Sequence, residues 1–145
     1  KCGIDPGRFK IGVAFAEDGV LLFSAIVPKE YQDDIAAALK NLNWDILSKW
    51  GQEGSTSVLS HSCLTSVYIG NGTSSDEIKA LLDTGINTEI VDERETTLEG
   101  RKLYWKIHPP KGISKIIPTS MRVPPRDIDD LAAFIIVRRS DFNIK

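Results

Sequence analysis

The chain has 145 residues and a mass of 16.0 kDa, the size of one domain, and this length excludes two-lobed folds of about 250 residues. Charged residues make up 26% and aromatic residues 8%, which is typical of a folded globular protein rather than a disordered one. No apolar run approaches the roughly 18 residues that a membrane span needs. We therefore expect a single domain over residues 1–145 with no membrane association.

The net charge of −2 hides an asymmetry along the chain. Residues 1–100 carry 8 Lys/Arg and 16 Asp/Glu, a net charge of −8, whereas residues 101–145 carry 10 Lys/Arg and 4 Asp/Glu, a net charge of +6. The basic last third favours a contact with a polyanion, although unevenly distributed surface charge is the simpler explanation. Cys2 and Cys63 have no metal or redox spacing and no basic-then-apolar leader is present, so we expect a cytoplasmic protein.

The chain order predicts strands that give way to alternating helices and strands. The predicted strands cover 3–5, 11–16, 20–27, 67–69 and 88–91, and the predicted helices cover 30–42, 74–85, 96–107 and 127–139. Asp18-Gly19 is a strong hairpin signal. Ser74 with Glu77, and Thr96 with Glu99, are capping-box patterns at helix starts. Residues 51–66 are assigned no more than a loop with a short strand.

Three groups of acidic residues lie where predicted strands end or helices begin, positions at which an α/β sheet often carries its site. The groups are Asp5 in the first strand, Asp92 with Glu93 after the buried last strand, and Asp127, Asp129 and Asp130 at the start of the last helix. Carboxylates that converge without Cys or paired His suit hard cations such as Mg²⁺ or Mn²⁺.

Each group also has a purely structural interpretation. Asp5 alone could pair with Arg8 or Lys10. The acidic residues after 91 could form a charged turn that caps the next helix, and those at 127–130 could complement a helix N-terminus. The convergence of all three groups favours a site.

Five segments in order resemble a known family. They are Gly3-Ile4-Asp5-Pro6-Gly7, Lys10-Ile11-Gly12-Val13-Ala14, Val67-Tyr68-Ile69-Gly70, Val91-Asp92-Glu93-Arg94-Glu95-Thr96-Thr97-Leu98-Glu99 and Ile128-Asp129-Asp130-Leu131-Ala132-Ala133. The set is similar to the motifs of the YqgF family of RuvX-type, Holliday junction resolvase-like proteins, with Gly100 where that family usually has Ala. The resemblance covers nearly the whole chain.

The resemblance implies an α/β domain of the RNase H-like fold shared with RuvC resolvases. Its central sheet would be mixed and five-stranded, with three antiparallel N-terminal strands and then parallel strands, flanked by helices. It also implies a metal-dependent endonuclease that acts on branched DNA or on precursor 16S ribosomal RNA. Asp5, Glu93 and Asp129 would be its catalytic residues and its ligands for Mg²⁺ or Mn²⁺, with Asp92 as the alternative to Glu93.

The chain departs from the RuvC pattern at two positions. Gly70 lies where RuvC-type enzymes have a Glu, and YqgF proteins usually have Gly there too. Arg126 lies where RuvC-type enzymes have a further acidic residue. A catalytically inactive module on the same fold, binding nucleic acid or protein, is therefore the alternative function. The sequence leaves open whether the protein is a monomer or a homodimer.

The basic residues near these motifs are the candidates for contact with nucleic acid. They are Lys10, Arg94, Lys111, Lys115, Arg122 and Arg126. Three of them belong to the segment 109–125, and five prolines deny that segment backbone donors and helix formation. We expect an extended, mobile loop over the edge of the site.

Overall fold

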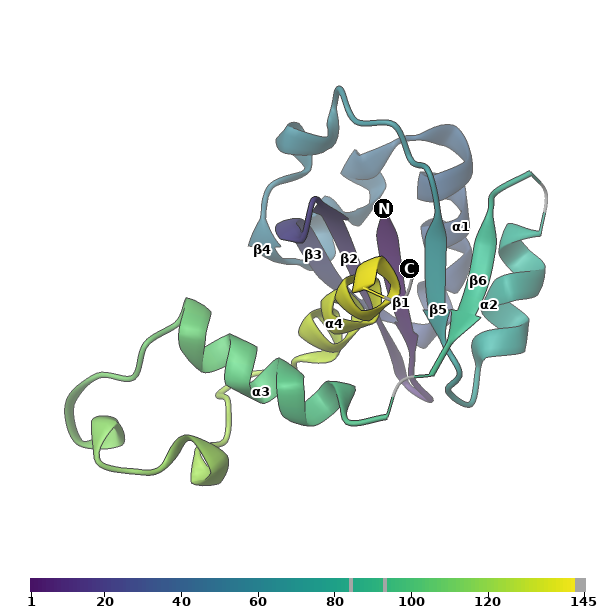
Figure 1. The fold of residues 1–145 in the computed structure, drawn as a ribbon. Coiled ribbons are helices and arrows are strands. Elements are labelled where there is room, and N and C mark those ends of the chain that lie inside the picture. The colour runs from purple at the N-terminus through teal and green to yellow at the C-terminus, as the bar shows by residue number, and fades with distance from the viewer. Residues whose placement is uncertain (84, 93, 143–145) are drawn as a thin grey trace.

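The computed structural model describes residues 1–83, 85–92 and 94–142, and its centre is a mixed six-stranded sheet (Figure 1). In the spatial order β4-β3-β2-β1-β5-β6, the strands are β4 (Gly51–Gly54), β3 (Val20–Pro28), β2 (Lys10–Glu17), β1 (Cys2–Pro6), β5 (Val67–Gly70) and β6 (Thr88–Val91). β1 to β4 pair antiparallel, whereas β5 pairs parallel with both β1 and β6.

Three sequence predictions about the sheet can be judged directly. The β2–β3 hairpin is confirmed, because Asp18 and Gly19 both have positive φ, 50° and 77°, as a tight primed turn requires. The five-stranded count is wrong, because β4 adds a short strand to the edge of β3. The expectation that 88–91 is buried is also wrong, because β6 is an edge strand whose Glu89 and Ile90 are exposed.

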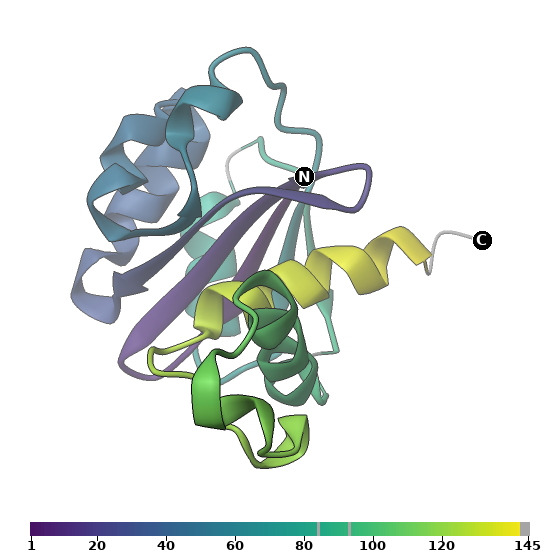
Figure 2. The ribbon, with the colours of Figure 1, turned by 90° about the vertical axis from the view of Figure 1, so that its left-hand side faces the viewer.

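Helices cover the two faces of the sheet in different ways (Figures 1 and 2). They are α1 (Gln32–Asn41) and α2 (Ser75–Leu82) on one face, and α4 (Asp129–Phe142) on the other, with α3 (Thr96–Ile107) packed on the outer side of α4. Among the described residues, no helix has both the length and the apolar character that crossing a bilayer requires.

The two helix starts predicted from capping-box patterns are confirmed, but the capping contacts themselves differ from the prediction. Ser74 is the N-cap of α2, but its hydroxyl makes no capping bond and donates to the carbonyl oxygen of Gly7 at 3.5 Å. The N-cap of α3 is Glu95 rather than Thr96, and Glu95 has a left-handed φ of 62°. A tertiary contact thus replaces the capping bond of Ser74, and a left-handed residue takes the N-cap position of α3.

Large and small side chains alternate along β2, so large side chains cover one face of the sheet and small ones the other. Ile11, Val13 and Phe15 are buried in the core beneath α1 and α2, whereas Gly12, Ala14 and Ala16 face α4. The small residues let α4 approach closely, and all its residues from 131 to 137 are buried between the sheet and α3. A helix that is apolar on every side is expected in such a position.

The segment 109–125 joins α3 to α4 and extends beyond the far end of α3, away from the sheet (Figures 1 and 2). It contains two short 3-10 turns, η4 (Gly112–Lys115) and η5 (Thr119–Met121), so the expectation of a wholly extended segment is wrong. We refer to residues 109–125 as the 109–125 loop.

Candidate active site

Asp5 lies near the end of β1, in the middle of the sheet. Its neighbours Ile4 and Pro6 are buried, while Asp5 is half-buried and pairs in register with Gly12 of β2. Gly3, two residues earlier on the same face, contacts α4 so closely that a Cβ there would lie 2.1 Å from the carbonyl oxygen of Ala133. Asp5 therefore faces the side of the sheet that α4 covers.

Asp129 reaches the same place from the other end of the chain. It is the first residue of α4, and a Cβ on Gly12 would lie only 1.9 Å from its carbonyl oxygen. The absence of a side chain at Gly12 thus lets the start of α4 rest on β2, beside the partner of Asp5. Asp5 and Asp129 both line a cavity of about 520 Å³, as two of the three predicted carboxylates were expected to do.

The cavity has cationic as well as acidic walls. Besides the two carboxylates it is lined by Lys10, Thr97, Arg101, Val123, Pro124, Pro125, Arg126, Asp127, Ile128 and Ala132. Thr97 and Arg101 lie one turn apart on α3, and so project from the same side of that helix. Arg101 was not among the individual candidates, although it begins the basic last third of the chain.

Lys10 pairs with two of the carboxylates that line the cavity. Its Nζ lies 2.5 Å from Oδ2 of Asp127 and 3.7 Å from Oδ2 of Asp129. The hydrogen bond to Asp127 raises the pKa of Lys10, which therefore stays charged. Burial raises the pKa of Asp129 above its ordinary value, and the ammonium of Lys10 only partly offsets this effect. The predicted nucleic-acid contact of Lys10 thus competes with a contact inside the site.

Arg126, also predicted to contact nucleic acid, is held by a partly buried network instead. It donates to Oδ1 of Asp130 at 2.8 Å and to Oε1 of Glu53 at 2.8 Å. The side chain of Asp130 is 0% exposed and accepts a second bond, 2.6 Å long, from Ser24. Glu53 also contacts the ring of His108 at 2.6 Å. This network gives Arg126 a structural role, and sequence reasoning missed it because it joins four separate segments.

The turn after β6 was expected to supply the third carboxylate. Glu93 lies outside the described residues. Asp92, the alternative, accepts a hydrogen bond from the backbone N–H of Arg94 at 3.1 Å and pairs with its Nε at 3.0 Å. These contacts make Asp92 a turn-forming residue that does not line the cavity, and they engage the guanidinium of Arg94 locally.

The other predicted cations belong to the 109–125 loop. Arg122 donates to the carbonyl oxygens of Ser114 at 2.9 Å and Lys115 at 3.1 Å, and its guanidinium lies 5.9 Å from the ring centre of Trp105. It therefore holds the loop together. Lys111 and Lys115 have exposed side chains, and their ammonium groups pair with no other described residue.

The cavity supplies part of the ligand set that a divalent ion needs. Asp5 and Asp129 supply the carboxylate oxygens that hard cations prefer. Within residues 1–83, 85–92 and 94–142, no three His, Cys, Asp or Glu side chains are grouped as a metal site. A complete ligand set therefore requires a further group, and the resemblance assigns that role to Glu93.

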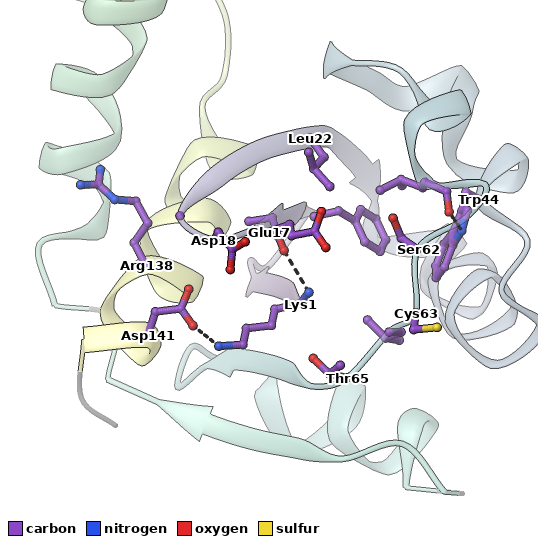
Figure 3. Close-up of a pocket in the computed structure, with 15 residues that line it drawn as sticks. Lys1, Glu17, Asp18, Leu22, Trp44, Ser62, Cys63, Thr65, Arg138 and Asp141 are labelled. Carbon is purple, nitrogen blue, oxygen red and sulfur yellow. Dashed lines mark hydrogen bonds and ion pairs between the residues drawn. The ribbon is translucent and has the colours of Figure 1, made fainter. Parts of the chain in front are cut away.

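A second cavity, of about 620 Å³, lies at the opposite end of β1 (Figure 3). Trp44 and Cys63 are on one side of it, and Arg138 of α4 is on the other. The ammonium of Lys1 pairs with Asp141 across the opening. None of the predicted site residues lines this cavity. The candidate site is therefore the cavity that contains Asp5 and Asp129, at the other end of β1.

Comparisons with known proteins add no assignment. No model of a protein family matches the chain, and a search of curated proteins finds no significant match. The functional argument therefore rests on the motifs of the sequence and on the geometry of the cavity that contains Asp5 and Asp129.

Proposed function

We propose that the protein is a divalent-metal-dependent endonuclease of the RNase H-like fold that cleaves structured nucleic acid in the cytoplasm. The observation that carries the proposal is the placement of Asp5 and Asp129, from opposite ends of the chain, in one cavity. A sheet with antiparallel N-terminal strands followed by parallel ones supports the fold assignment. The substrate class, branched DNA or precursor 16S ribosomal RNA, comes from the resemblance of the motifs.

Asp5, Asp129 and Glu93 would hold Mg²⁺ or Mn²⁺. A bound ion of this kind neutralises phosphate charge and activates water for in-line displacement. Asp129 must lose its proton to bind a cation, and because its pKa is raised, low pH opposes binding. Lys10, which pairs with Asp127 and Asp129, would be available to contact the phosphate if these carboxylates held a metal ion.

The remaining walls of the cavity orient the substrate. Arg101 is exposed on α3 and lines the cavity, and no ion pair joins it to another described residue. A guanidinium in this position matches the geometry of a phosphate group. Arg101 therefore takes the role that the sequence assigned to Arg126.

Cleavage assays on a four-way DNA junction and on precursor 16S ribosomal RNA, with Mg²⁺ or Mn²⁺, test the proposal. Asp5→Asn and Asp129→Asn should each abolish cleavage and weaken Mn²⁺ binding in calorimetric titrations. Asp18→Asn is the matched control, because Asp18 is exposed at the far end of the sheet and Asn tolerates its positive φ. Cleavage by Asp5→Asn at the parent's rate would overturn the assignment.

A catalytically inactive binding module on the same fold is the second candidate. Two observations favour it: Lys10 already pairs with Asp127 and Asp129 in the cavity, and Arg126 replaces the acidic residue of RuvC-type enzymes. This function predicts that the protein binds nucleic acid and gives no Mn²⁺ isotherm. A measurable isotherm that Asp129→Asn removes would exclude it.

A further inference from the structure

The 109–125 loop carries an unusual concentration of exposed aliphatic side chains. Ile113 is 83% exposed, Ile116 82%, Met121 71% and Val123 76%. Outside this loop, only Phe9 among the large apolar residues that the structure describes has a comparable exposure, 78%. Such a group of apolar side chains on a protruding segment indicates a contact surface.

The same region is uniformly cationic. Between positions 100 and 126 the sequence contains seven Lys/Arg and no Asp/Glu. Lys111 and Lys115 alternate with the exposed aliphatic residues, and their ammonium groups pair with no described carboxylate. A surface of this composition suits a partner that is both anionic and able to bury apolar groups.

Internal contacts hold the loop in shape. Arg122 bridges the two turns through its hydrogen bonds to Ser114 and Lys115, and it stacks on Trp105 of α3. The loop is thus a folded segment that protrudes from the domain (Figure 2), and its aliphatic side chains are exposed, so that little ordering is needed when they bind.

The loop is continuous with the candidate site. Its last residues, Val123, Pro124 and Pro125, form part of the wall of the cavity that contains Asp5 and Asp129. A polyanion seated in the cavity would therefore extend along the loop. This continuity favours nucleic acid as the occupant over a lipid surface, because a flat bilayer has no segment that enters a cavity of about 520 Å³.

We propose that the 109–125 loop is an apolar wedge that inserts between unstacked bases at a branch or bulge of the bound nucleic acid. This inference rests on the proposed function and adds to it: the protein would prefer interrupted helices to continuous duplex. Ile113, Ile116 and Met121 replace the stacking that the separated bases give up, while Lys111 and Lys115 contact the flanking phosphates. Inserted aliphatic side chains unstack neighbouring bases in other complexes, and lysine contacts add a salt-dependent attraction.

The test uses the fluorescence of 2-aminopurine, which rises when the base is unstacked. The probe is placed next to the branch point of a four-way junction and, separately, in a linear duplex of the same sequence, with Ca²⁺ in place of Mg²⁺. The variant I113S/I116S/M121S should bind the junction about tenfold more weakly, lose the fluorescence rise and bind the duplex as the parent does. Val58→Ser, at another exposed aliphatic residue, should change neither value.

The variant K111A/K115A separates charge from insertion. It should weaken binding to both DNAs and reduce the slope of log K against log salt by about 0.9 for each phosphate that the lysines no longer neutralise. Because all substituted side chains are exposed, a thermal melt should show that both variants fold.

The failure of this inference is distinguishable from the failure of the proposed function. A serine variant that binds the junction with the parent's affinity and fluorescence change would overturn the wedge, whatever the cleavage assay shows. Loss of binding to phosphatidylserine vesicles by that variant, with junction binding intact, would assign the loop to a lipid surface instead. Junction binding and unstacking by a parent that cleaves nothing would leave the wedge standing and overturn the nuclease.

Discussion

Gly12→Ala should separate the two carboxylates of the candidate site. A Cβ at position 12 would lie 1.9 Å from the carbonyl oxygen of Asp129 and 2.8 Å from the backbone nitrogen of Asp130, whereas ordinary contacts begin at 3.4 Å. The start of α4 must therefore move by about 1.5 Å, and no flexible side chain is present to absorb the overlap. The displacement carries Asp129 away from Asp5, which is paired with Gly12.

Two measurable effects follow from this displacement. Overpacking of this kind costs about 3 kcal/mol of the free energy of unfolding, which lowers Tm by roughly 9 °C in a chain of this size. Metal ligation tolerates shifts of only about 0.2 Å, so Gly12→Ala should also lose its Mn²⁺ isotherm. Thermal unfolding followed by circular dichroism, and calorimetric titration with Mn²⁺, measure the two effects.

Gly100→Ala is the matched control. It also lies against α4, but its Cβ would be 3.4 Å from its nearest neighbours, which is ordinary contact. Ala should stabilise the interior of α3 by about 0.5–1 kcal/mol relative to Gly. If Gly12→Ala melts with the parent and binds Mn²⁺ equally well, the close approach of α4 does not position Asp129.

Three further predictions concern titratable groups. Burial raises the pKa of Asp129 above its ordinary 3.8, so the stabilising contribution of Asp129 is present at low pH and is lost as the pH rises through the raised pKa. Asp129→Asn should therefore raise Tm at pH 7 in the absence of metal, and the difference should shrink toward pH 3. A lower Tm of the variant at pH 7 would contradict this. Burial opposes ionisation of Glu53, but its bonds to a histidine and an arginine lower its pKa overall. The contribution of Glu53 to the free energy of unfolding is therefore present above pH 4.5 and is lost as the pH falls below that value. Glu53→Ala should cost about 2 kcal/mol in denaturant unfolding at pH 7, and equal stability of the variant would show that the network is dispensable. Burial raises the pKa of the Cys2 thiol to about 12, so a thiol reagent should label only the exposed Cys63 until the protein unfolds, and labelling of both in the native state would refute the burial.

The elements could largely be predicted from local patterns, because most of them depend on side-chain periodicity. The alternation along β2 indicates a strand, and the turn at Asp18 and Gly19 dictates the hairpin. The short strand expected somewhere in residues 51–66 is confirmed as β4, but its position could not be predicted, because Gly51–Gly54 has no apolar side chain and becomes a strand only by pairing with β3. The capping-box patterns predicted where α2 and α3 begin but not the capping contacts, since the hydroxyl of Ser74 bonds Gly7 and Glu95 takes the N-cap position of α3.

The candidate site could be predicted only in part. Asp5 and Asp129 were identified because carboxylates are unusual in a buried strand and at the start of an apolar helix. The roles of the cations were harder to predict, because charge alone does not tell a phosphate contact from an internal ion pair. Lys10 and Arg126 turn inward to carboxylates, whereas Lys111 remains exposed, and only the packing distinguishes them.

The sixth strand gives a structural reason for the cation at position 126. Glu53 of β4 contacts His108, just before the 109–125 loop, and accepts from Arg126, just after it, so a single carboxylate fixes both ends of the loop. An acidic residue at 126 would face Glu53 and the fully buried Asp130 with like charge, in a place where little water screens the repulsion. A chain with Glu53 in this position therefore needs a cation at 126. Because Arg126 also binds Asp130, beside Asp129, the network that anchors the loop also sets the start of α4.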